Sequence, residues 1–127
     1  MAVTTNDISN KYQIKPLSKK YTDASKPYAL VTGSSLGIGR SMVHRLASLG
    51  YNIILVALPE QGLLDLAKEL ENTYNVKAIP YGIDLTKESA PKEILDYCTA
   101  NKLGINILIN NAGFGLGGLF QNIDIAR

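Results

Sequence analysis

The sequence predicts an α/β fold in which parallel strands alternate with helices, and two observations support this prediction. Four short apolar runs alternate along the chain with three longer segments whose apolar residues recur at helical spacing. The runs at residues 52–58 and 105–110 are apolar without alternation, which is typical of strands covered by helices on both faces. The expected order is therefore βαβαβαβ, with right-handed crossovers between parallel strands.

Local signals give the bounds of each element. Strands are expected at Tyr28–Thr32, Asn52–Leu58, Lys77–Ile83 and Ile105–Asn110, and helices at about Ile38–Leu49, Gln61–Tyr74 and Lys87–Asn101. Gly50 lies where the C-terminal stop of the first helix is expected. In the third helix, Ile94, Leu95 and Cys98 are expected to face the core.

The chain is expected to consist of a flexible leader and part of one folded domain. Residues 1–26 are polar and rich in lysine, whereas residues 27–127 contain every expected strand and helix. The first 27 residues hold five lysines against two aspartates, a charge of +3, while the whole chain carries +2. The remainder therefore carries −1 and lacks the basic excess of a nucleic-acid-binding surface.

Cysteine, histidine and apolar content exclude several classes of protein. The single cysteine, Cys98, cannot form an internal disulfide, which fits a reduced, cytoplasmic setting. The single histidine, His44, rules out a metal site with several histidine ligands, and we expect it to be a solvated surface residue. No apolar run approaches the roughly 20 residues of a membrane span, so no membrane partner is expected.

A glycine-rich segment directly follows the first expected strand and reads Thr32-Gly33-Ser34-Ser35-Leu36-Gly37-Ile38-Gly39. Gly33 would permit the turn off the strand, Gly37 would let backbone N–H groups approach a phosphate, and Gly39 would allow close packing of the helix. A pyrophosphate would then lie at the helix N-terminus, which attracts anions. On spacing alone, a generic glycine turn before a helix is an equal alternative.

Two further polar segments follow the third and fourth expected strands. Asp84-Leu85 offers a carboxylate that can accept a hydrogen bond from an exocyclic amine such as that of adenine; the alternative is capping of the next helix. Asn110-Asn111-Ala112-Gly113 offers amides that can tie strands together and face a ribose; the alternative is an ordinary polar strand end. Ligands bind outside the carboxyl ends of parallel strands, which is where these segments fall.

Together the three motifs resemble the short-chain dehydrogenase/reductase family, classical type. Thr32–Gly39 fits its TGxxxGxG motif, Asp84 fits its adenine-contacting aspartate, and Asn110–Gly113 reproduces NNAG, in the correct order over about residues 27–127. The resemblance implies a Rossmann-type parallel sheet of strand order 3-2-1-4, here truncated after its fourth strand. It also implies an NAD(H) or NADP(H) cofactor.

The resemblance further implies a role for each matching residue. The backbone around Ser35, Leu36 and Ile38 would hold the pyrophosphate, and Thr32 would fix the glycine turn against the NNAG segment. Asp84 and Leu85 would contact adenine, and the residues from Asn111 to Gly113 would line the cofactor ribose. The implied cofactor-binding residues are Gly33, Ser35, Leu36, Gly37, Ile38, Gly39, Leu58, Asp84, Leu85, Asn111, Ala112 and Gly113.

The choice between NAD and NADP is left open by the residues that usually decide it. NAD binding favours an acid about 20 residues past the glycines, at the end of the second strand, where this chain has Leu58. NADP binding favours a basic residue, which in this family often precedes the second motif glycine, where this chain has Leu36. Glu60 is either a partner for a ribose hydroxyl or an exposed acid at a helix start.

The family's catalytic residues are missing from this sequence. The resemblance implies hydride transfer between nicotinamide and a carbonyl or alcohol substrate, with proton transfer by the tyrosine of a Tyr-x-x-x-Lys motif. A tyrosine needs a neighbouring cation to act near neutral pH. None of the seven tyrosines has a lysine four residues later, and the 14 residues after Gly113 contain no Tyr, Ser or Lys. We therefore expect a cofactor-binding N-terminal half that is inactive alone.

Two other interpretations stay open at this point. The chain is alternatively a non-catalytic dinucleotide-binding or interaction module, or a truncated fragment without a function of its own. For a full-length member, the resemblance implies homo-oligomers and a small-molecule substrate.

Overall fold

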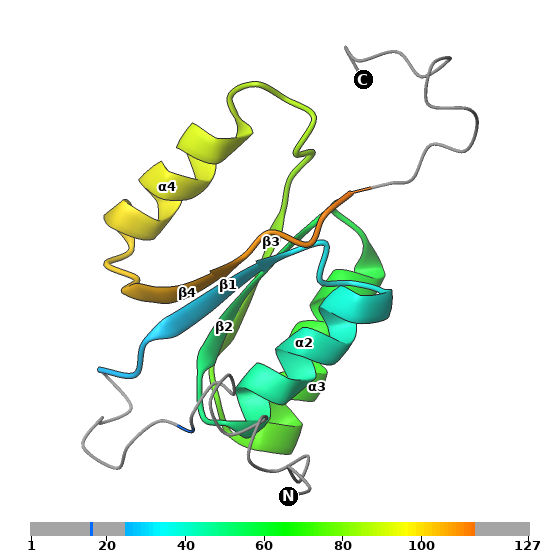
Figure 1. Ribbon diagram of the computed structural model, residues 1–127, viewed down its shortest axis with the longest axis vertical. Helices are drawn as coiled ribbons and strands as arrows, with labels where there is room; N and C mark the ends of the chain where they lie inside the picture. The colour runs from blue at the N-terminus through cyan, green and yellow to red at the C-terminus, as the bar shows by residue number, and fades with distance from the viewer. Residues whose placement is uncertain (1–15, 17–24, 114–127) are drawn as a thin grey trace, which may run out of the picture.

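Figure 1 shows the computed structural model, which describes residue 16 and residues 25–113. Within this part of the chain, a four-stranded parallel sheet has the order β3-β2-β1-β4. The strands are β1 (Tyr28–Thr32), β2 (Asn52–Ala57), β3 (Ala78–Gly82) and β4 (Ile105–Ile109), and the helices are α2 (Gly37–Ser48), α3 (Gln61–Tyr74) and α4 (Ala90–Ala100). The predicted fold class and strand order are thus confirmed. Most of the expected leader lies outside the described residues.

The central strand β1 positions the rest of the sheet. Its Val31 pairs with Leu55 of β2 on one side and with Ile109 of β4 on the other. Because the strands are parallel, their carboxyl ends meet at one edge of the sheet. The chain order reverses beside β1, since β2 and β3 lie on one side of it and β4 on the other. Such a switch point is where open α/β sheets bind ligands.

Two apolar layers sandwich the sheet. Helices α2 and α3 lie on one face and α4 lies on the other (Figure 1). Ala29 and Val31 of β1 pack in the first layer, and Tyr28 and Leu30 pack in the second, because successive side chains of a strand point to opposite faces. Both strands β1 and β2 are buried along their whole length, as their unbroken apolar sequences predict.

Helix α4 begins at Ala90, three residues later than predicted. The Oδ1 atom of Asp84 accepts hydrogen bonds from the backbone N (2.9 Å) and the Oγ1 (2.7 Å) of Thr86. These bonds form a turn that competes with helix after β3. Pro91 then lies in the first turn of α4, a position that proline favours.

The prediction that Leu95 faces the core is wrong. Leu95 of α4 is 64% exposed, and Leu108 of β4 is 60% exposed. Helix α4 packs on the sheet through Ile94 and Cys98, against a cluster that includes Leu30 of β1. Within the described residues β4 is an edge strand, so its outer side and the neighbouring side of α4 lack a covering element.

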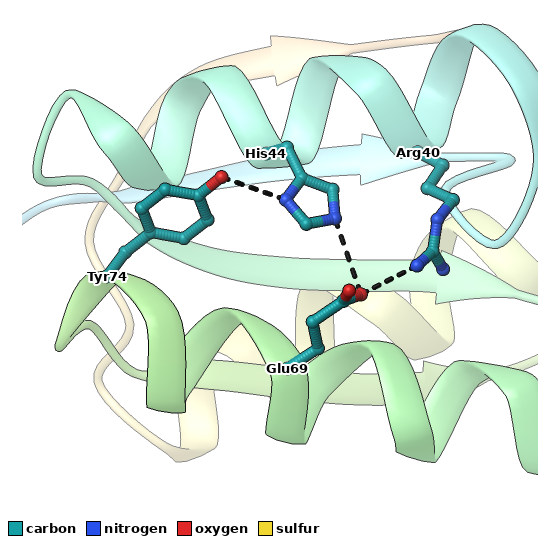
Figure 2. A network of polar contacts seen from close by, with 4 residues as sticks. All are labelled: Arg40, His44, Glu69 and Tyr74. Atoms are coloured by element: carbon teal, nitrogen blue, oxygen red, sulfur yellow. Dashed lines mark hydrogen bonds and ion pairs between the residues drawn. The ribbon is translucent and has the colours of Figure 1, made fainter.

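His44 is a link between two helices rather than a solvated surface residue, which corrects the sequence-based expectation (Figure 2). Its Nδ1 lies 3.0 Å from the Tyr74 hydroxyl, and its Nε2 lies 3.4 Å from the Glu69 carboxylate. Neutral imidazole satisfies both contacts when Nε2–H donates to Glu69 and Nδ1 accepts from Tyr74. Glu69 also pairs with Arg40 at 2.6 Å, so the first turn and the middle of α2 are both tied to α3.

The core beneath α3 gives a direct stability prediction. Leu70 is fully buried, and Leu64 of the same helix is 46% exposed. We expect Leu70→Ala to lower the free energy of unfolding by about 2–5 kcal/mol, because it leaves a cavity in the core. Leu64→Ala should change it by about 0.5 kcal/mol or less. Urea unfolding of the two variants checks this, and equal losses would contradict the packing described.

Candidate functional site

A cleft of about 980 Å³ opens at the carboxyl edge of the sheet. It lies at the switch point beside β1 and extends between α4 and the sheet. The ends of β1, β2 and β4 and the segment after β3 all contribute to its wall. Its lining residues are Leu30, Thr32, Gly33, Ser35, Leu36, Ala57, Leu58, Glu60, Ile83, Asp84, Leu85, Thr86, Pro91, Ile94, Leu95, Cys98, Ile105, Leu108, Asn110, Ala112 and Gly113.

Most of the residues singled out from the sequence meet in this cleft. Those that line it are Gly33, Ser35, Leu36, Leu58, Asp84, Leu85, Ala112 and Gly113. The other four, Gly37, Ile38, Gly39 and Asn111, are not among the lining residues. Gly37, Ile38 and Gly39 form the first turn of α2. Asn111 supports the glycine turn through a hydrogen bond from its side chain to the Gly33 carbonyl.

Gly33 and Gly39 are required for close packing. Gly33 has φ +65°, and a Cβ atom there would lie 2.8 Å from the Cα of Ala112. At Gly39, a Cβ atom would meet the Gly33 carbonyl and would lie 2.6 Å from the Asn111 Nδ2. Neither position has room for a side chain. These two glycines therefore bring the start of α2 against the ends of β1 and β4.

Gly37 has a different role, because the space beside it is open. It is the first residue of α2 and has φ +57°, and no atom lies within 4 Å of the place where its Cβ would be. The first N–H groups of a helix have no partner inside the helix. In α2 no side chain caps them and no acidic residue lies in the first turn. The turn therefore presents backbone donors and the positive end of the helix dipole to an anion.

Thr32 joins the glycine turn to the segment after β4. Its Oγ1 accepts hydrogen bonds from the backbone N of Asn111 and of Ala112, both at 3.0 Å. The Asn111 side chain donates from Nδ2 to the Gly33 carbonyl at 3.1 Å. Backbone and side-chain bonds thus hold two segments that lie about 80 residues apart in the sequence.

Sequence reasoning missed the role of Ser34. This residue is fully buried in the glycine turn, and its hydroxyl lies 3.5 Å from the Val56 carbonyl. The same carbonyl accepts a 2.8 Å hydrogen bond from the Gly33 backbone N. A small hydroxyl residue directly after a turn glycine is the signal that was available, since serine readily bonds to nearby backbone.

Asp84 lies two residues after the end of β3, where hydrogen bonds stabilise its carboxylate form. The hydroxyl and the backbone N–H of Thr86, with a smaller contribution from the charge of Lys87, hold the pKa of Asp84 below its ordinary value. Both bonds from Thr86 end on Oδ1. No described residue donates a hydrogen bond to Oδ2, so this oxygen is available to a donor in the cleft.

The charge of the cleft is negative. Glu60 and Asp84 are its acidic lining residues, and none of the described lining residues is lysine, arginine or histidine. Among residues 16 and 25–113, no group of three or more His, Cys, Asp or Glu side chains is placed to hold a metal ion. No helix in this part of the chain is long and apolar enough to cross a bilayer. Among the described lining residues, an anion would therefore meet only neutral donors, which are backbone N–H groups and side chains such as Ser35 and Thr86.

Comparison with known sequences identifies the family. The sequence model of the short chain dehydrogenase family matches residues 27–127. The chain belongs to this family. A very-long-chain 3-oxoacyl-CoA reductase from Candida glabrata is 39% identical over 94 residues, which span 74% of this chain and 27% of that protein. The chain thus matches well under half of this curated relative, and the relative itself is an oxidoreductase.

Solved structures of the family have the same fold. The alcohol dehydrogenase of Comamonas testosteroni specific for bulky ketones aligns with a TM-score of 0.68 at 34% identity, over 79% of this chain and 40% of that one. The L-sorbose reductase of Gluconobacter frateurii, solved with NADPH and L-sorbose, aligns with a TM-score of 0.72 at 27% identity, over 80% and 38%. The short-chain dehydrogenase assignment and the Rossmann-type sheet made from the motifs are thus confirmed.

The packing at Gly39 predicts a large effect of one methyl group. Gly39→Ala should lower the free energy of unfolding by about 1–3 kcal/mol, because the added Cβ collides with the backbone of Gly33. Gly62→Ala in α3 is the matched control, since no atom lies within 4 Å of its Cβ position. It should be neutral or stabilising by up to about 1 kcal/mol. Thermal unfolding of both variants checks this, and a harmless Gly39→Ala would refute the close contact.

The bonds to Asp84 predict a titration. Its carboxyl should titrate below the range of ordinary aspartates in carboxyl-carbon NMR. A lowered pKa favours the folded state above the ordinary aspartate pKa, and this contribution is lost as pH falls through the lowered value. Thr86→Val removes the hydroxyl donor and should move the pKa up, towards the ordinary value.

Thr99→Val is the control for this titration. The Thr99 hydroxyl donates to the Leu95 carbonyl at 2.9 Å and makes no contact with Asp84. The pKa of Asp84 should stay low in this variant. An unchanged Asp84 pKa in Thr86→Val would show that the threonine hydroxyl does not control it.

Proposed function

We propose that this chain is the cofactor-binding part of an NAD(P)-dependent oxidoreductase. The observation that carries the proposal is the uncapped N-terminus of α2, left open at Gly37, beside a cleft that contains the acceptor Asp84. An adenine dinucleotide has an anionic pyrophosphate and an exocyclic amine, which these two features complement. The NADPH bound to the L-sorbose reductase adds support from a protein of the same fold.

In this proposal, different residues of the site contact different parts of the cofactor. The backbone at Ser35, Leu36, Gly37 and Ile38 holds the pyrophosphate through N–H groups. The free Oδ2 of Asp84 accepts a hydrogen bond from adenine, beside Leu85. The open space at Gly37 and the absence of a capping side chain fit a phosphate group, because they leave its approach to the helix unobstructed.

The segment after β4 completes the site. Asn111 already donates to Gly33, so its side chain mainly positions the turn, while Ala112 and Gly113 line the cleft where a ribose would lie. Leu58, directly after β2, also lines the cleft. The Thr32 hydroxyl holds the segment after β4 against the glycine turn by accepting two backbone hydrogen bonds.

The reaction class follows from the family and the cofactor. A bound nicotinamide supplies or accepts a hydride, which pairs with a carbonyl or alcohol substrate. The residues of this chain bind and orient the cofactor. None of its tyrosines has a lysine four residues later, so we expect these 127 residues to bind the dinucleotide without turning over substrate.

Dinucleotide binding tests the proposal. The 127-residue chain should bind NADH or NADPH, measured by the change in nicotinamide fluorescence on titration. Gly37→Val should weaken binding at least about tenfold, because the side chain fills the space of the phosphate and cannot easily adopt φ +57°. A variant that binds as well as the wild type would refute the assignment of α2.

Gly104→Val supplies the control. Gly104 precedes β4, has no atom within 4 Å of its Cβ position and does not line the cleft. Its substitution should leave dinucleotide binding intact. Thermal unfolding of all three proteins separates a binding defect from a folding defect. Absence of binding by a folded wild-type chain would overturn the proposed function.

A further inference from the structure

The rim of the cleft between α2 and the end of β2 is apolar. Leu36, directly before α2, is 76% exposed, and Leu58, directly after β2, is 60% exposed. Both line the cleft. In dinucleotide-binding α/β sheets, the residue about 20 positions beyond the glycines meets the adenosine ribose. This rim is therefore the wall that a ribose 2′-substituent would face.

The charged group at this rim is a carboxylate. Glu60 directly precedes α3 and lines the cleft, and no described residue donates a hydrogen bond to its side chain. A carboxylate can accept a hydrogen bond from a ribose hydroxyl. A 2′-phosphate has about two negative charges at neutral pH and would be repelled by Glu60.

Two described cations that lie near cleft residues in the sequence interact with carboxylates. Arg40 of α2 pairs with Glu69 of α3 at 2.6 Å, as Figure 2 shows. The charge of Lys87 contributes to lowering the pKa of Asp84. Neither lines the cleft. A 2′-phosphate would therefore enter a rim that offers it two leucines and an acid, with no described cation in the wall.

We propose that this site prefers dinucleotides with a free 2′-hydroxyl, NAD and NADH, over their 2′-phosphorylated forms. The inference rests on the proposed function and specifies its ligand. The L-sorbose reductase, which has the same fold, was solved with NADPH. The fold itself thus accommodates a 2′-phosphate, and the preference arises from Leu36, Leu58 and Glu60.

A paired titration tests the preference. NADH and NADPH contain the same fluorescent nicotinamide and differ only in the 2′-phosphate, so one signal reports both affinities. The 127-residue chain should bind NADH about tenfold or more tightly than NADPH at low ionic strength. Added salt should reduce the ratio of the NADH affinity to the NADPH affinity, because it screens the repulsion between the 2′-phosphate and Glu60.

Three variants assign the effect to the rim. Leu58→Arg supplies the missing cation and should reverse the ratio in favour of NADPH. Glu60→Gln removes the repulsive charge and should narrow the ratio. Thr73→Arg adds the same charge as Leu58→Arg at the exposed, opposite end of α3, and it should leave the ratio as in the wild type.

The possible results separate the two proposals. Equal affinities, or tighter binding of NADPH by the wild type, would overturn the preference and leave the proposed function standing. If the ratio of NADH affinity to NADPH affinity is unchanged in both Leu58→Arg and Glu60→Gln, the proposed roles of Leu58 and Glu60 are wrong. Failure of the folded chain to bind either dinucleotide would overturn the proposed function, and the preference with it.

Discussion

The site depends on one contact, in which the end of β4 lies directly against the turn that leaves β1. Thr32 accepts two backbone hydrogen bonds from the residues after β4, and Asn111 donates back to Gly33. Gly33 and Gly39 have no Cβ, which lets the two segments and α2 approach this closely. Without this contact, the start of α2 would not lie beside the cleft, and the glycine turn and the segment after β4 would not be held together.

Among the described residues, the cleft offers an anion backbone N–H groups and a helix dipole rather than cations. The wall contains two acids and no described basic residue, while the uncapped start of α2 supplies the positive potential. A helix N-terminus attracts phosphate only over about one turn. In the proposed function, such a site holds the pyrophosphate locally, and a further negative charge near Glu60 would weaken binding. The proposed preference for a free 2′-hydroxyl would then arise at the rim that holds Leu36, Leu58 and Glu60.

Much of the fold could be predicted because its signals are local. Tyr28–Thr32 forms a strand and Gln61–Tyr74 forms a helix, both with the predicted bounds. The strand is a short, continuous apolar run, and the apolar residues of the helix recur at helical spacing, so both patterns lie within the segment itself. The start of α4 could not be predicted, because the turn from Asp84 to Thr86 competes with the helix. Leu95 looks like a core residue by its spacing, yet no described element covers it.

By itself, the sequence determined the alternation of elements, the three motifs and the edge of the sheet at which they meet, because periodicity and glycine spacing are properties of short segments. Only the tertiary structure decided that Asn111 braces Gly33, that His44 joins Glu69 and Tyr74, and that Glu60 shares a wall with Leu36 and Leu58. These contacts join residues far apart in the chain. They form only when the strands pair in the observed order and register, which brings segments distant in the sequence together.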